Sequence, residues 1–210
     1  MNPRIALLSI GLVSTLALGL GSAASPRQAK SAPAPNLSGT YRIDGGHSTV
    51  LFKVKHMNTS WAFGRFDDIS GNFTMNSASP EKSSVSVEIA AASVDTGVKQ
   101  RDDHLKSSSF FDAVQFPSVN FSSKSVKKAG EGKYKVEGEL SLHGVQQPLT
   151  VDFEQVGYSD SPKMGLRTGF LGTFTVKRSD FGMNYMPEGI GDEVQLTISI
   201  EGVQTDVGAK

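Results

Sequence analysis

Apolar and polar side chains alternate with a period of two along most of the chain after Gly39. The alternation is clearest at residues 84–89, 134–142, 149–154 and 194–201. This period places successive side chains on opposite faces, so it predicts antiparallel strands with one dry face and one wet face. Further β-strand candidates are residues 40–44, 48–57, 64–75, 117–127 and 165–177.

About eight or nine such strands follow one another through short links that contain Gly, Pro and Asn. An all-β chain closes into a barrel or a sandwich because an open sheet edge invites aggregation. The candidates at 48–57 and 64–75 are long, and the second contains Gly64 and Gly71, which are typical of a bulge or a sharp bend. We therefore expect an all-β fold, an extended antiparallel barrel rather than a flat sandwich.

One segment, residues 94–112, departs from this alternation and predicts a short helix of about two turns. Asp95 or Thr96 can cap its start. The positions spaced for one apolar helical face are Val94, Val98 and Leu105. We expect this helix to lie over one end of the barrel or in a crossover, followed by an aromatic cluster.

The N-terminal residues carry the pattern of a secretory signal peptide. Arg4 precedes an apolar run at residues 5–20, and small residues follow at 22–24. The run is short for a membrane span, which needs roughly 20 residues, although an uncleaved anchor is the alternative. We expect a signal peptide (1–24), a flexible linker (25–38), one β-barrel domain (39–204) and a C-terminal tail (205–210). The mature protein would then be exported, without a stable membrane span.

Composition excludes several functions. Lys plus Arg and Asp plus Glu number 21 each, so the net charge is 0, which argues against a nucleic-acid partner. The chain has no cysteine, which excludes disulfides, cysteine-ligated metals and a thiol nucleophile.

Enzymatic motifs are weak. The four histidines have no local spacing of a metal site, and no G-x-S-x-G elbow or phosphate-binding glycine loop is present. The carboxylate pairs Asp67-Asp68 and Asp102-Asp103 are sequence neighbours whose side chains diverge. We therefore predict no catalytic residue, no metal and no cofactor.

A ligand site is better supported by aromatic residues together with a few basic ones. An eight-stranded barrel is wide enough to hold one small ligand, and an apolar lining with few polar groups is typical of such sites. A guanidinium suits a phosphate or carboxylate headgroup; surface ion pairs and ordinary core packing are the plainer explanations. The predicted ligand-binding residues are Phe52, His56, Arg65, Phe66, Arg101, His104, Phe110, Phe111, Phe121, His143, Phe153, Phe174, Arg178 and Phe181.

Eight motifs, in this order, resemble the YceI-like family of exported, lipocalin-like proteins over about residues 40–203. They are DGGHS (44–48), VKHM (54–57), GRFDDISG (64–71), VDTGVKQRDDHLKSSSFFD (94–112), FPSVNF (116–121), GELSLHGVQQPL (138–149), KRSDFGM (177–183) and GDEVQLTISIE (191–201).

The resemblance implies an extended eight-stranded antiparallel lipocalin-like β-barrel with a short helix. The barrel would enclose an apolar tunnel for a polyisoprenoid or a related amphipathic lipid, such as an isoprenoid quinone precursor or a fatty-acid derivative. The location would be the bacterial periplasm or outside the cell, and the role that of a binder or carrier rather than an enzyme. The chain departs from the family pattern at Gly45-Gly46, which loosens a turn, and in the compact link 184–190. The second departure could change one mouth of the barrel.

Two other functions stay open from the sequence. The protein could be an enzyme that acts on such a lipid, with His47, His104 or His143 as general base. It could instead be a barrel filled by its own side chains, which acts as a stress-related interaction module. A homodimer through an exposed strand edge is compatible with each of these functions.

Overall fold

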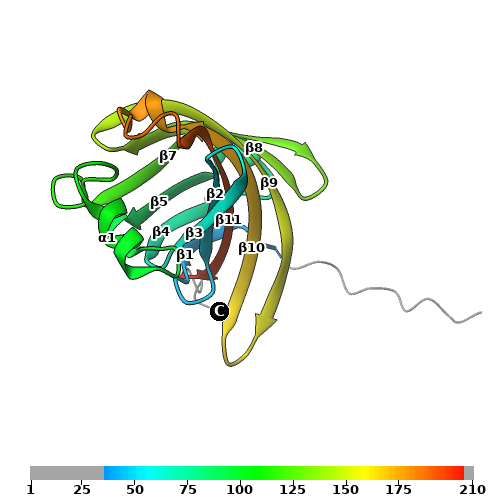
Figure 1. Cartoon of the computed structure of the whole chain (residues 1–210). Coiled ribbons are helices and arrows are strands. Elements are labelled where there is room, and N and C mark those ends of the chain that lie inside the picture. Colours follow the sequence, from blue (N-terminus) through cyan, green and yellow to red (C-terminus); the bar gives the residue numbers. More distant parts are fainter. Residues whose placement is uncertain (1–35, 206–210) are drawn as a thin grey trace, which may run out of the picture. The chain divides into compact units, whose positions relative to one another are not determined.

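The computed structural model describes residues 36–205, which form one antiparallel sheet of 11 strands (Figure 1). The strands are β1 (Gly39–Ile43), β2 (Thr49–His56), β3 (Ser60–Phe66), β4 (Ile69–Met75), β5 (Ser84–Ala90), β6 (Val94–Asp95), β7 (Ser118–Gly130), β8 (Lys133–Leu142), β9 (Val145–Ser161), β10 (Gly165–Lys177) and β11 (Ile190–Gln204). The helices are α1 (Lys99–Lys106) and the 3-10 turns η1 (Pro80–Lys82), η2 (Ala91–Ser93) and η3 (Arg178–Phe181).

Eight of these strands close into a ring, in the order β1-β4-β5-β7-β8-β9-β10-β11, and β11 pairs back with β1. Strand β11 pairs with β1 near its C-terminal end and with β2 over the rest of its length. Strands β1 and β2 therefore act as one long strand interrupted at residues 44–48, and β3 and β4 pair alongside them in the same way. The predicted eight-stranded antiparallel barrel is confirmed.

The strand predicted at 64–75 is in fact two strands, β3 and β4, separated by Asp67 and Asp68. These residues leave the ladder to bond with the segment around η2: Asp67 N donates to Ser93 O at 3.1 Å, and Ala90 N donates to Asp68 O at 3.0 Å. Beyond the break, Gly71 lies so close to β5 that a Cβ would be 2.1 Å from the carbonyl oxygen of Ser86. Asp67 and Asp68 thus interrupt the sheet at a point where the sequence predicted one continuous strand.

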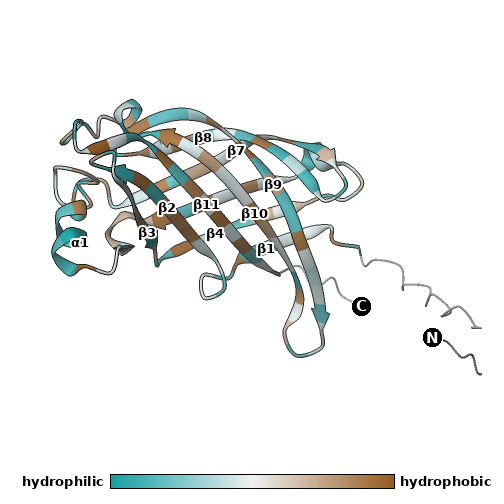
Figure 2. Cartoon of the chain, turned by 45° about the vertical axis from the view of Figure 1, so that its right-hand side comes forward, coloured by the Kyte–Doolittle hydropathy of each residue, from teal (hydrophilic) through white to brown (hydrophobic). Residues whose placement is uncertain are grey.

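Hydrophobic and hydrophilic residues alternate along the strands (Figure 2), and the hydrophobic positions supply the buried interior. Tyr41 and Phe73 stack with their ring centroids 4.9 Å apart, and Phe170 packs edge-on against Phe73 at 5.6 Å. The Tyr41 side chain is fully buried, and its hydroxyl donates to the carbonyl oxygen of Leu37 at 2.9 Å. This aromatic group fills the barrel on the side of the β1 N-terminus.

Helix α1 lies beside β6 at the opposite end of the barrel (Figure 2). Its start differs from the prediction: Val98 occupies the N-cap position without a side-chain cap bond, and neither Asp95 nor Thr96 caps the helix. The predicted apolar face is also wrong, since Val94 belongs to β6 and Val98 is exposed. The helix begins only at Lys99, after a bend in which Gly97 has φ 77°, so Val94 and Val98 lie outside it.

The predicted signal peptide (1–24), most of the predicted linker (25–38) and residues 206–210 of the predicted tail lie outside the described residues. Residues 36–38 pack on the barrel, where Leu37 is buried and the Ser38 carbonyl accepts a bond from Gln204 at 3.1 Å. Within residues 36–205, no helix combines the length and the apolar character needed to cross a bilayer.

Candidate ligand-binding cavity

The barrel encloses a cavity of about 350 Å³ whose lining is almost entirely apolar. Inward-facing residues of β2, β3, β5, β7 to β11 and α1 contribute to it, and no carboxylate does. The predicted residues that line it are Phe52, His56, Phe66, Arg101, His104, Phe110, Phe111, Phe121, Phe153, Phe174 and Arg178. A pocket of this size and make-up suits a small apolar or amphipathic molecule. It also contradicts the alternative of a barrel filled by its own side chains.

Aromatic rings form one wall of the cavity. The ring of Phe66 lies 5.6 Å from that of Phe52 and 5.5 Å, edge-on, from that of Phe111. Residues 52 and 66 share this wall because β2 and β3 are neighbours and both positions face inward. Phe111 comes from the segment after α1, so the helix region closes the wall.

The mouth of the cavity is defined by those lining residues that are also exposed. They are Lys55, His56, Phe63, Arg101, His104, Tyr185 and Met186. Two of them, Lys55 and Arg101, are permanent cations and none is acidic, so these lining residues carry positive charge. The His104 ring lies 5.1 Å, edge-on, from both Phe110 and Tyr185. This contact joins α1 to the link 184–190, the segment that the sequence singled out as shaping one mouth.

Arg101 reaches the mouth while it is bound to the turn before α1. Its Nε donates to the hydroxyl of Thr96 at 2.7 Å, and its Nη2 donates to the Thr96 carbonyl at 2.8 Å. Asp102 accepts two further hydrogen bonds, from the backbone N–H and the hydroxyl of Thr96. The bond from the hydroxyl is the main reason that the pKa of Asp102 lies below its ordinary value. These bonds hold the predicted residue Arg101 in a fixed position at the mouth.

Arg178 lines the cavity, but its donors are directed into the wall. Its Nε, Nη1 and Nη2 donate to the carbonyls of Gly191, Met183 and Ile190 at 3.1, 2.6 and 2.9 Å. Burial lowers the pKa of this guanidinium, and the nearby Asp192 opposes that effect. Arg178 thus holds the two ends of the 183–191 segment together. Its guanidinium is bonded to the backbone, whereas the sequence suggested that it would contact a ligand headgroup.

Three predicted residues lie outside the cavity lining: Arg65, His143 and Phe181. Arg65 holds an outward position on β3 and forms ion pairs with Asp67 and Asp95 at 2.7 and 3.1 Å. The strand alternation explains this, since its neighbour Phe66 takes the inward position.

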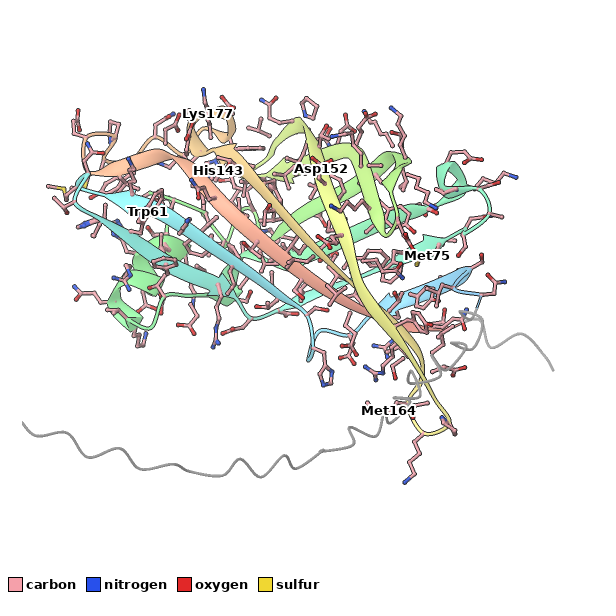
Figure 3. All side chains as sticks on the ribbon, turned by 90° about the vertical axis from the view of Figure 1, so that its right-hand side faces the viewer. Trp61, Met75, His143, Asp152, Met164 and Lys177 are labelled. Carbon is pink, nitrogen blue, oxygen red and sulfur yellow. The ribbon has the colours of Figure 1, made fainter. Side chains whose placement is uncertain are left out.

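His143 occupies the β8–β9 turn with φ 53°, outside the cavity (Figure 3). Its Nδ1 lies 3.0 Å from the carbonyl oxygen of Phe181, and its ring packs on Phe116 at 4.8 Å. Phe181 itself is buried behind the lining, in an apolar cluster with Val119 and Leu140, which do line the cavity. Both residues therefore hold the turn against η3.

Some lining residues were missed by the sequence reasoning. Val50 and Val54 share the inward parity of Phe52 and His56, and both line the cavity. That parity was a usable signal, whereas Thr96 and Tyr185 sit in irregular segments without one. Of the three histidines considered as general base, His104 lines the cavity, while His47 and His143 do not.

A smaller pocket of about 60 Å³ lies beyond the base of the cavity, and Val85 and Phe153 line both spaces. Tyr134, Phe73 and Phe170 line the smaller one. The Phe153 ring also excludes a side chain at Gly172, where a Cβ would lie 2.7 Å from it. Phe153 and Val85 thus form the partition that sets the depth of the cavity.

A polar cluster forms away from the cavity, where β1 meets β11. Asp44, His47 and Glu201 place their ligand atoms within 4.8 Å of one another, close enough to hold one metal ion. The guanidinium of Arg167 already bridges the two carboxylates, with its Nη1 2.8 Å from Asp44 and 2.5 Å from Glu201. Arg167, followed by His47, holds the pKa of Asp44 at about 2. These ion pairs link the end of β1 to β10 and β11, and we call Asp44, Arg167 and Glu201 the clasp.

Comparison with known proteins places this barrel in a family. The model of the YceI-like domain matches residues 41–202, which is nearly the whole described barrel. The chain belongs to the YceI-like family. A UPF0312 protein of Ectopseudomonas mendocina (strain ymp) is 39% identical over 190 residues, which cover 90% of this chain and 96% of that protein.

Solved structures of other bacterial proteins share the fold. Burkholderia cenocepacia BcnA superposes with a TM-score of 0.69 and 26% identity, covering 76% of this chain and 98% of that one. A polyisoprenoid binding domain from Saccharophagus degradans, implicated in plant cell wall breakdown, gives a TM-score of 0.61. That domain covers 78% of this chain and 98% of its own at 17% identity, so its likeness shows the fold alone.

Proposed function

We propose that this YceI-like protein binds and carries a polyisoprenoid or a related amphipathic lipid in the barrel cavity. The supporting observation is the apolar cavity with a cationic mouth at one end and an aromatic partition at the other. Each buried methylene contributes about 0.8 kcal/mol, so a prenyl or acyl chain gains most of its affinity from the lining. The polar or anionic end of the lipid would then lie at Lys55 and Arg101.

The location belongs to the same proposal. The pattern at residues 1–24 favours export to the periplasm or beyond, where an apolar lipid needs a protein to cross water. The Saccharophagus degradans domain, which shares this fold, is named for a polyisoprenoid, the class of ligand that we propose here.

The test is titration of the delipidated protein with prenyl alcohols of increasing length and with oleic acid, followed by native mass spectrometry. The expected result is a 1:1 complex with at least one of these lipids. Phe174→Glu places a charge in the lining and should abolish binding, whereas Thr175→Glu on the outward face of the same strand should leave it intact. Ala62→Trp, which fills the lining without a charge, is the second blocking variant. Binding of none of the lipids by folded protein would contradict the proposal.

A further inference from the structure

The outward face of the hairpin formed by β2 and β3 carries aromatic and aliphatic side chains that a soluble surface rarely exposes together. Phe63 is 64% exposed, Leu51 46% and Trp61 39%. Across the hairpin, Lys53 is directly opposite Phe63 and Lys55 is opposite Trp61. We call these five residues the hairpin patch. Exposed apolar groups gathered in this way mark an interaction surface.

The hairpin patch is positively charged through its two lysines. The Nζ atoms of Lys53 and Lys55 lie 4.8 and 5.8 Å from the centre of the Trp61 ring. Within residues 36–205, neither lysine forms an ion pair, although seven other basic side chains do. On the neighbouring strand β11, uncharged Gln195 and Thr197 pair with Lys53 and Leu51. The patch is thus both apolar and cationic.

The hairpin patch adjoins the mouth of the cavity. Lys55 and Phe63 belong to both, and Met57 in the hairpin turn is 52% exposed. Trp61 lies towards the end of the barrel opposite the β9–β10 turn that carries Met164 (Figure 3). Strand β3 pairs with β6 only at Arg65 and Phe66, so among the described strands its residues 60–64 have β2 as their sole partner.

We propose that the hairpin patch is a docking surface for an anionic lipid bilayer. Tryptophan rings settle at the bilayer interface, and lysines close to the surface are attracted to anionic headgroups. Contact through this face sets the cavity mouth against the membrane, the place from which an apolar ligand enters or leaves. This inference goes beyond lipid binding in the cavity. It can be tested separately, with vesicles that contain no ligand for the cavity.

The experiment is vesicle flotation with protein purified after export, its N-terminus checked by mass spectrometry. Vesicles contain phosphatidylcholine alone or phosphatidylcholine with phosphatidylglycerol, and no prenyl lipid. We expect about tenfold stronger partitioning onto the anionic vesicles, which weakens as added salt screens the lysines. Equal binding to both vesicles, or no binding to either, would overturn the proposal.

The deciding variant is Lys53→Glu with Trp61→Ala, because neither residue lines the cavity. It should partition at least about tenfold less onto anionic vesicles and still bind lipid delivered from detergent. The matched control is Lys128→Glu with Tyr158→Ala, an exposed lysine and an exposed tyrosine on β7 and β9. The control should partition like the unaltered protein.

The alternative partner for the hairpin patch is a second copy of the chain, which could pair with the edge of β3 that has no other strand beside it. Light scattering after size exclusion distinguishes it: a dimer that Lys53→Glu with Trp61→Ala dissociates would assign the patch to self-association and overturn the membrane proposal. Circular dichroism and thermal melts confirm that each variant is folded before its partitioning is compared.

Discussion

The carboxylate of Asp102 accepts two hydrogen bonds from Thr96, one from the backbone N–H at 2.8 Å and one from the hydroxyl. Arg101 binds the other side of the same threonine. Thr96 lines the cavity, so the pair ties the first turns of α1 to the end of β6 at the mouth. A polar contact therefore adds to the apolar packing of Phe110 and Phe111 in holding this end of the barrel.

Substitution Asp102→Ala should loosen α1 while the barrel stays folded. Loss of the Asp102 carboxylate leaves the Thr96 N–H and hydroxyl without their acceptor. We therefore expect several-fold faster hydrogen exchange at residues 96–106. Lipid dissociation should accelerate with it. The matched control is Asp103→Ala, which loses only an exposed ion pair with Lys99. Equal exchange in the two variants would show that the Thr96 contact does not hold the helix.

The partition between the two pockets offers a test of ligand length. Phe153→Ala should join the cavity to the smaller pocket and cost about 3 kcal/mol of unfolding free energy, because it creates a cavity in a packed region. We expect the preferred prenyl chain to lengthen, measured by competition between chain lengths in native mass spectrometry. Val156→Ala, an exposed position on the same strand, serves as control. An unchanged length preference would mean that the partition does not set ligand depth.

Much of the fold was predictable because the strand signal is local. Val194, Leu196 and Ile198 are the alternating apolar positions of their strand, and all three face the cavity in the structure. The break at Asp67 and Asp68 was not predictable, because it depends on bonds to a segment more than twenty residues away. Gly64 was read as a bend, yet its absent side chain makes room for the Phe52 ring, which would lie 2.3 Å from a Cβ.

The candidate site was predictable where parity or an aromatic side chain marked it, as at Phe52 and Phe153. Charged residues were harder to assign, because a guanidinium has the same sequence signature whether it faces a ligand, an ion pair or a carbonyl. Arg101 lies at the mouth, Arg65 pairs with carboxylates on the outer face, and Arg178 bonds to the backbone. Only the three-dimensional partners distinguish these roles.

The backbone bonds of Arg178 predict a stability effect. Arg178→Met keeps the apolar stem but removes donors from three carbonyls, so we expect a loss of about 3 kcal/mol in the free energy of unfolding. Proteolysis should also become faster in the 183–191 segment. Urea denaturation measures the first effect and limited digestion the second. Lys177→Met, at an exposed neighbouring position, should change neither. A stable, protease-resistant Arg178→Met would refute the holding role.

The clasp between β1 and β11 predicts how stability depends on pH. The folded-state pKa of Asp44 is about 2, against an ordinary value of 3.8, chiefly because Arg167 donates to it. A lowered pKa stabilises the fold at pH above about 4, and the contribution disappears as the pH falls towards 2. Because the carboxylate is partly exposed, we expect about 1–2 kcal/mol at neutral pH.

Denaturant unfolding at pH 7, 4 and 2.5 checks this contribution in the protein and in Asp44→Asn. The variant should be less stable at pH 7, and the difference from the unaltered protein should shrink as the pH falls to 2.5, because the charge at residue 44 contributes less as the pH nears its folded-state pKa. Asp152→Asn removes an ion pair with Lys135 in which the aspartate is 72% exposed, so it should leave the pH dependence unchanged. A constant difference between the protein and Asp44→Asn across this range would show that the clasp stabilises the seam by packing rather than by charge.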